Sequence, residues 1–182
     1  INTKNKVYNL GKGTSTQVTH KDIEKMVTQC INHLKKKKYE LNIPSKVSYY
    51  NGKKMLKLSP SKFAKKVLKI KQSGVRCKGG KNLIHIGLHY FQFKEGPGED
   101  IEYKSYRDDS TIGNMYCQNN YQRLLITIAH EVSHHIQYKY CPRVDRFKTN
   151  YRKAHGECFK TIYRYLRRDL INPMIEDQNK IN

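Results

Sequence analysis

The sequence predicts an α+β domain in which a small mixed sheet packs on one long, largely apolar helix. Apolar residues recur at spacings of three and four over 20–37, 120–138 and 155–170, as the buried face of a helix requires. Between these stretches, residues 82–93 alternate apolar and polar side chains, which is the two-residue period of a strand. Helices at both ends and strand signals between them indicate helices and sheet packed around one core.

A capped helix is predicted near the start of the chain. Thr19 and Asp22 have the spacing of a capping box ahead of the helix over 20–37. That helix ends in a run of four lysines, whose charge suits the negative end of the helix dipole. A hairpin is predicted next, with strands over 46–50 and 54–58, because Asn-Gly lies between them.

Three further elements follow from local signals. A serine followed by Pro60 is typical of a helix start, with Phe63 and Ile70 on the buried side. Residues 94–120 contain Gly-Pro-Gly and many polar side chains, so we expect a long loop with room for one short strand. The tail after Pro173 is expected to fray.

The charge of the chain points to a polyanionic partner. The net charge is +21, and residues 1–80 carry 20 basic against 3 acidic side chains, or +17 of that total. Such a field favours nucleic acid, because each phosphate neutralised by a lysine releases condensed counterions. A second interpretation stays open, in which biased codon usage has enriched the lysines and they form only a solvated face.

Cysteine usage and hydropathy predict the compartment. The five cysteines are odd in number, widely spaced and never arranged as C-x-x-C, which disfavours a disulfide framework and a four-cysteine zinc ribbon. The longest apolar runs fall far below the ~20 residues that cross a bilayer, and the first residues lack the apolar region of a secretory signal. We expect no membrane partner and an intracellular, reducing compartment, such as cytoplasm, nucleoid or nucleus. A virion-associated location stays open.

The stretch from His130 to His134 reads His-Glu-Val-Ser-His and lies inside the predicted helix 120–138. Residues four apart on a helix stack on one face, so both imidazoles reach one Zn²⁺ at about 2.0–2.1 Å. Glu131, beside the first histidine, is then placed to act as a general base on water. This is the H-E-x-x-H pattern of zincins, which predicts His130 and His134 as zinc ligands.

A catalytic zinc needs a third protein ligand and an open fourth position. Downstream candidates are Asp145, His155 and Glu157. His155 is preferred because it opens the predicted helix over 155–170, and the preceding loop can fold it back over the metal. His135 points about 100° away from His134 around the helix and is excluded by geometry.

These residues resemble the SprT-like metalloproteases, which carry H-E-x-x-H followed about twenty residues later by H-G-x-x-F or H-G-x-x-W. Here twenty residues separate His134 from His155, and Phe159 closes the second motif. The resemblance covers about residues 120–170. It implies that the three histidines bind zinc, that Glu131 is catalytic, and that the substrates are proteins crosslinked to DNA or tightly bound on it.

We therefore expect a zincin-like α+β fold, with a small mixed sheet packed on the H-E-x-x-H helix and a C-terminal helix carrying the third ligand. Residues 1–182 are expected to form a single domain, with a basic N-terminal part over about 1–80 and a metalloprotease core over about 82–172. The expected function is a zinc-dependent endopeptidase acting on DNA-associated or DNA-crosslinked proteins through water activated by Glu131.

The sequence leaves two other functions possible and does not identify the oxyanion donor. One function is a general or viral metallopeptidase without DNA dependence, and the other is a non-enzymatic nucleic-acid-binding protein stapled by zinc. Glu131 argues against the second, because a structural zinc site needs no general base. An additional oxyanion donor is expected among Tyr151, Arg152 and Tyr116, and nothing in the sequence selects one.

Overall fold

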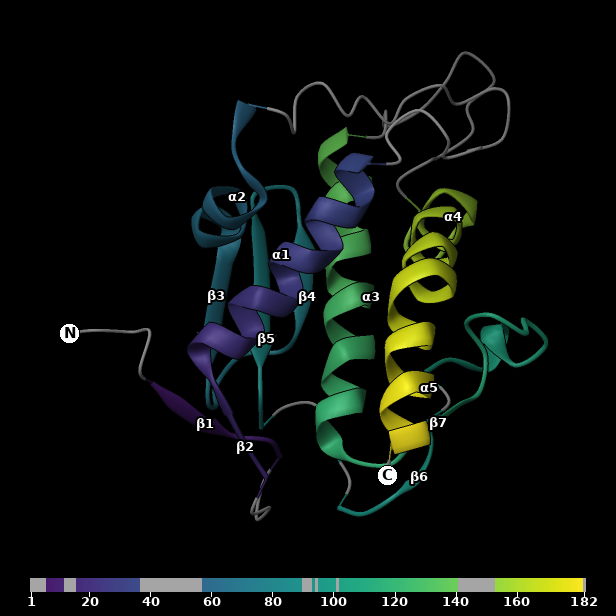
Figure 1. Cartoon of the computed structure of the whole chain (residues 1–182). Helices are drawn as coiled ribbons and strands as arrows, with labels where there is room; N and C mark the ends of the chain where they lie inside the picture. Colours follow the sequence, from purple (N-terminus) through teal and green to yellow (C-terminus); the bar gives the residue numbers. More distant parts are fainter. Residues whose placement is uncertain are drawn as a thin grey trace.

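Helices and short strands follow one another along the chain in the computed structural model (Figure 1). It describes residues 6–11, 16–36, 57–89, 93, 95–100, 102–140 and 153–181. The helices are α1 (His20–Lys36), α2 (Pro60–Val67), α3 (Asn120–Tyr140), α4 (Glu157–Leu166) and α5 (Asn172–Ile181), with a 3₁₀ turn over Lys104–Tyr106 and a π-helical turn over Arg167–Ile171. The strands are β1 (Val7–Asn9), β2 (Gln17–Thr19), β3 (Leu68–Lys71), β4 (Lys78–Gly80), β5 (Leu83–Gly87), β6 (Gly98–Asp100) and β7 (Met115–Cys117).

The described strands form three small sheets. The largest has the order β3-β5-β4, with β3 parallel and β4 antiparallel to the central β5. The other two are the antiparallel pairs β1-β2 and β6-β7. The predicted α+β class and the small mixed sheet are therefore confirmed.

Helix α1 forms as its sequence predicts. The N–H of Asp22 donates to Thr19 Oγ1 at 3.1 Å and the N–H of Thr19 donates to Asp22 Oδ2 at 3.3 Å, which is the reciprocal capping arrangement. The apolar face of the helix is buried and comprises Ile23, Met26, Val27, Cys30, Ile31 and Leu34. This face packs against α2 and α3, so the helix is held by tertiary contact as well as by its cap.

Helix α2 begins as predicted but ends earlier. Ser59 caps it by accepting a hydrogen bond from the N–H of Lys62 at 3.3 Å, and Pro60 occupies the first turn. The backbone turns extended at Leu68, so Ile70 is buried on β3 and not on the helix. Pairing with β5 decides this outcome, because β3 gains a parallel neighbour. The predicted hairpin over 46–58 lies outside the described residues, apart from its last two.

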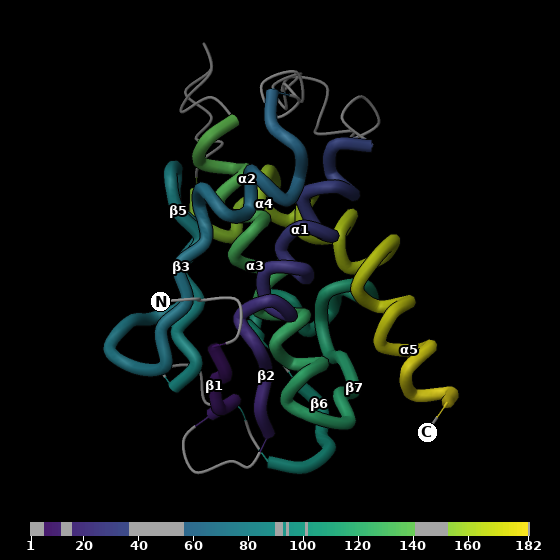
Figure 2. Tube along the Cα trace, turned by 60° about the vertical axis from the view of Figure 1, so that its left-hand side comes forward, coloured from purple at the N-terminus to yellow at the C-terminus, as the bar shows by residue number. Residues whose placement is uncertain are grey.

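Helix α3 runs through the middle of the molecule. The β3-β5-β4 sheet lies on one side of it and α4 on the other, with α1 crossing it (Figures 1 and 2). Its residues from Gln122 to Gln137 are all buried. Strand β4 comes closest, since a Cβ added at Gly79 would lie 1.9 Å from the carbonyl oxygen of Glu131. Only glycine permits this approach of strand to helix.

Three other expectations differ from the structure. Within the described residues of the strand predicted over 82–93, β5 forms and ends at Gly87, opposite the end of its parallel partner β3. The loop over 94–120 contains two short strands, β6 and β7. The tail after Pro173 is helical as α5, where Ile175 is buried and Gln122 donates hydrogen bonds to two side chains of the helix. Tertiary contacts stabilise a helix in a segment whose apolar residues show only a weak helical spacing.

Two further features concern the cysteines and the length and polarity of the helices. Cys30, Cys77, Cys117 and Cys158 are free thiols. Within the described ranges, every helix is too short or too polar to cross a bilayer.

Candidate metal centre

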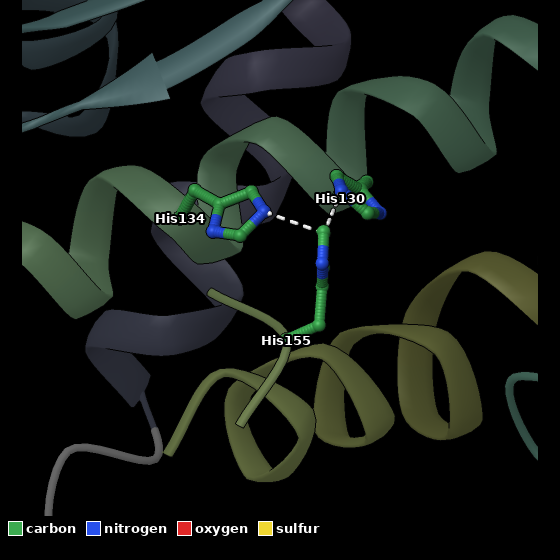
Figure 3. Close-up of side chains that lie close together, drawn as sticks. All are labelled: His130, His134 and His155. Atoms are coloured by element: carbon green, nitrogen blue, oxygen red, sulfur yellow. Dashed lines mark hydrogen bonds between the residues drawn. The ribbon is translucent and has the colours of Figure 1, made fainter. Parts of the chain in front are cut away.

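Three histidines converge between α3 and α4. Helix α3 presents His130 and His134 one turn apart, and His155 reaches toward them from the segment before α4 (Figure 3). Nε2 of His155 lies 3.1 Å from Nε2 of His134 and 3.2 Å from Nε2 of His130. The ligand atoms of the three residues all lie within 4.8 Å of one another. The three predicted ligands are thus brought to one point.

His155 does not lie on a helix, which corrects the expectation that the C-terminal helix carries the third ligand. Its φ is +58°, in the left-handed region that side-chain-bearing residues rarely adopt. Gly156 is the N-cap of α4, which begins at Glu157, and its N–H donates to the carbonyl of Lys153 at 2.9 Å. The tight turn places the imidazole against α3. Such strained backbone conformations concentrate at functional sites.

Hydrogen bonds fix the tautomers of the two helical histidines. Nδ1 of His130 lies 2.8 Å from Glu102 Oε2, and Nδ1 of His134 lies 3.1 Å from Gln137 Oε1. The amide nitrogen of Gln137 donates to the carbonyl of Lys153 at 2.9 Å, so its oxygen is the atom that faces His134. Both Nδ1 atoms therefore carry the proton, and both Nε2 atoms present a lone pair at the point of convergence.

The convergence point suits a cation. Nε2 of His155 can supply one proton at most, so the lone pairs that face it are not all satisfied by hydrogen bonds within the cluster. In tetrahedral coordination with bonds of about 2.0–2.1 Å, two ligand nitrogens lie about 3.3 Å apart. The observed separations from His155, 3.1 and 3.2 Å, are close to that value. The three residues thus fit a metal ion that accepts imidazole ligands.

Burial keeps the histidines in the form that binds metals. It lowers the pKa of His130 and of His134 from 6.5 to about 3, with further lowering by Arg167 at His130 and by His130 at His134. Burial also lowers the pKa of His155, which is more exposed. Neutral imidazole is the ligand form, so the cluster is preorganised for metal at neutral pH.

Glu131 lies beside the cluster. Its Oε1 is 3.8 Å from Nε2 of His130, and its buried Oε2 has no hydrogen-bond partner among the described residues. Burial, and after it the charge of Glu102, raises the pKa of Glu131 to about 8, and a backbone hydrogen bond from Gly79 opposes the change. A raised pKa and a free oxygen are what a general base at this position requires.

A carboxylate that sequence reasoning missed supports the first ligand. Glu102 accepts from His130, from the hydroxyl of Tyr163 and, at 3.1 Å, from Nη1 of the buried Arg167. Burial raises the pKa of Glu102 to about 8, and Arg167 is the strongest influence in the opposite direction. Carboxylates that orient a metal-binding histidine are a common second layer of such sites. No local signal identified Glu102, because it lies 28 residues before His130 in a polar loop.

Aromatic rings enclose the cluster. Phe159, which closes the second motif, stacks on His134 with ring centroids 4.2 Å apart, and Tyr103 packs on His155 at 4.4 Å. A cavity of about 100 Å³ lies alongside and is lined by Glu102, Tyr103, Ile126, Thr127, His130 and Glu131.

Of the three expected oxyanion donors, the structure describes Tyr116. Tyr116 lies on β7 with 49% of its surface exposed and is not among the lining residues. Tyr151 and Arg152 lie outside the described residues. Tyr103 lines the cavity and packs on His155, and it was not among the expected donors.

The rejected ligand candidates occupy other positions. His135 is buried on the opposite side of α3, where its Nδ1 lies 2.6 Å from the carbonyl oxygen of Gly80. The side chain of Glu157 is 70% exposed and lies 3.9 Å from Arg164. Asp145 lies outside the described residues.

Comparisons of the chain with protein-family models, with curated proteins and with solved structures found no match. The class of protein therefore rests on the fold and the site. The chain is an α+β protein with small sheets, in which His130, His134 and His155 lie close enough to hold a metal ion.

Proposed function

We propose that the protein is a zinc-dependent endopeptidase. One observation carries the proposal: the buried carboxylate of Glu131, with an oxygen unpartnered among the described residues, lies beside three convergent histidines, of which His130 and His134 direct their Nε2 lone pairs toward His155. A purely structural zinc site uses four closed ligands and needs no such base. Three protein ligands and an adjacent carboxylate are the arrangement of catalytic sites.

The residues of the chain divide the work of peptide hydrolysis. When bound, zinc supplies a Lewis acid that activates water and polarises a carbonyl. Glu131 accepts a proton from the attacking water at its free oxygen and returns it to the departing amine nitrogen, so no covalent enzyme intermediate forms. Glu102 holds the imidazole of His130, and Tyr103, which packs on His155 and lines the cavity, is the residue that we assign as hydrogen-bond donor to the oxyanion.

The substrates are proteins bound or crosslinked to DNA. This finer proposal is supported by the resemblance of residues 120–170 to SprT-like metalloproteases and by the net charge of +21. A general or viral metallopeptidase and a zinc-stapled nucleic-acid-binding protein are the alternatives that the experiment must separate.

The test is a cleavage assay on a DNA-binding protein with and without single- and double-stranded DNA. Glu131→Gln removes the base but not the three ligands, so it should retain stoichiometric zinc and lose about 10²–10⁴-fold in turnover. The exposed Glu176→Gln is the matched control and should cleave like the wild type.

Each alternative has its own outcome. Equal cleavage of free proteins without DNA supports the general metallopeptidase. Turnover in Glu131→Gln at the wild-type rate, or the absence of cleavage in a zinc-loaded wild type that binds DNA, refutes the peptidase assignment.

A further inference from the structure

A second pocket is lined by lysines and shares no lining residue with the three-histidine cluster. It measures about 570 Å³ and is lined by side chains of α2 and of the last turn of α3, among others. The described residues that line it are Lys57, Leu58, Phe63, Lys66, Lys81, Lys139 and Tyr140; we call it the lysine pocket. None of these residues contacts the metal-binding cluster, so the pocket is a separate feature.

No carboxylate among the described residues compensates the positive charge of the lysine pocket. None of its four lysines forms an ion pair with a carboxylate in the part of the chain that the structure describes. The ammonium of Lys139 lies 5.6 Å from the centroid of the Phe63 ring and 6.0 Å from that of Tyr140. Burial, followed by the charges of Lys66 and Lys81, lowers the pKa of Lys139. Four converging cations repel one another, and a bound polyanion removes that repulsion.

The basic surface continues past the rim of the pocket. Nζ of Lys35, at the end of α1, donates to the carbonyl of Leu58 at 2.7 Å, which brings a fifth lysine to the edge. Lysine presents a compact charge on a flexible stem and binds phosphate as a point charge, whereas arginine is favoured for paired carboxylates. The described lining contains lysine and no arginine.

We propose that the lysine pocket binds consecutive backbone phosphates of a nucleic acid strand. Several cations spread over about 570 Å³ match more than one phosphate, which a linear polyphosphodiester supplies. The aromatic floor of Phe63 and Tyr140 is buried, at 4% and 8% exposure, so base stacking contributes little and binding is insensitive to sequence.

The location ties the pocket to the metal centre. Lys139 follows His134 by five residues on α3, a rise of about 7.5 Å. Lys81 follows β4, whose Gly79 touches the backbone of Glu131. A strand held in the pocket therefore keeps an attached protein close to the histidines. The inference rests on the nucleic-acid part of the proposed function and not on the peptidase part.

The experiment compares two triple variants with equal loss of charge. Lys66, Lys81 and Lys139 are changed to Gln in the first, which keeps much of each aliphatic stem. The second changes the exposed Lys21, Lys25 and Lys180 at the other end of the molecule, none of which lines the pocket. Zinc content and circular dichroism establish that both variants are folded.

Binding is measured by fluorescence anisotropy with a labelled oligothymidylate of about 16 nucleotides, from low to physiological salt. The logarithm of the affinity falls with the logarithm of the salt concentration by about 0.7 per neutralised phosphate, so each contact contributes about fivefold in affinity at about 0.1 M salt. Loss of the three lysines should therefore weaken binding by the pocket variant about 10- to 100-fold. Its salt slope should fall by about 2. The control variant should lose less than about threefold, because its charges are screened.

Competition identifies the ligand. Unlabelled oligothymidylate should displace the probe from the wild type far better than tripolyphosphate or poly-glutamate at equal charge. Equal displacement by tripolyphosphate assigns the pocket to small oligophosphates, and equal displacement by poly-glutamate assigns it to acidic proteins; either overturns the inference. If the two variants lose affinity equally, the pocket is not the binding site although nucleic-acid binding stands. If the wild type shows no affinity, the DNA part of the proposed function fails as well.

Discussion

The hydrogen bond between Glu102 and His130 gives the sharpest test of the metal centre. In Glu102→Gln the side chain keeps its shape, but one acceptor oxygen becomes an NH₂ donor. Three donors face Glu102 in the wild type, namely His130 Nδ1 at 2.8 Å, Arg167 Nη1 at 3.1 Å and the hydroxyl of Tyr163. Glutamine offers a single acceptor oxygen, so its NH₂ group must face at least one of these three donors, and that hydrogen bond is lost.

Two quantities should change, each with its own cause. Loss of the partner of a metal-binding histidine lowers metal affinity by about 10- to 100-fold, or about 1.4–2.7 kcal/mol. Arg167 is 1% exposed and loses its carboxylate, so the free energy of unfolding should also fall, by about 3–5 kcal/mol. Adding Arg167→Met to Glu102→Gln should recover part of the stability, because no buried guanidinium is then left without its carboxylate.

The assay is competition for zinc against a chromophoric chelator, with chemical denaturation of the metal-free protein in parallel. Asp109→Asn is the control, because Asp109 pairs with Arg164 at 2.7 Å and touches no histidine of the cluster. It should change stability and leave zinc affinity unaltered. If folded Glu102→Gln binds zinc as tightly as the wild type, the assignment of Glu102 as the residue that positions His130 is wrong.

Three further predictions concern the ligand set, the packing of β4 and pH. His155→Ala should lose tight stoichiometric zinc while Glu157→Ala keeps it, as measured by metal analysis; retention of zinc in the first variant contradicts the ligand set. Gly79→Ala should destabilise the fold by at least about 2 kcal/mol, because its Cβ would overlap α3. Gly80→Ala, whose Cβ meets Leu83 at an ordinary 3.5 Å, should be tolerated in the same denaturation series. Burial lowers the pKa of His135 from 6.5 to about 4. As the pH falls, His135 is therefore protonated in the unfolded chain before it is protonated in the folded protein. The stability advantage of the metal-free wild type over His135→Asn should therefore shrink as the pH falls from 6.5 toward 4, and an advantage that grows there would disprove neutral burial.

Features governed by neighbours in the sequence were predictable. The buried apolar face and the cap of α1 follow from the spacing of residues a few positions apart. The placement of His130 and His134 on one side of α3 follows in the same way, since positions four apart share a helix face. His155 was preferred because it opens the predicted helix over 155–170, and the structure brings it to the other two histidines although α4 begins only at Glu157. What the sequence did not reveal is its conformation, because a φ of +58° depends on the turn that Gly156 and α4 complete.

Other features depend on segments far apart in the chain. Ile70 lies on a strand because β5 offers it a partner, and the tail forms α5 because Gln122 and the core hold it. Glu102 reaches His130 across 28 residues, and the lysine pocket combines α2, the turn after β4 and the end of α3. By itself the sequence determined the helices with strong periodicity, the pair of ligands on one of them and the excess of positive charge. Only the tertiary structure decided which carboxylate orients a ligand and which lysines line the pocket. Hydrogen bonds and charge clusters between distant segments produce no regular spacing of residues in the sequence.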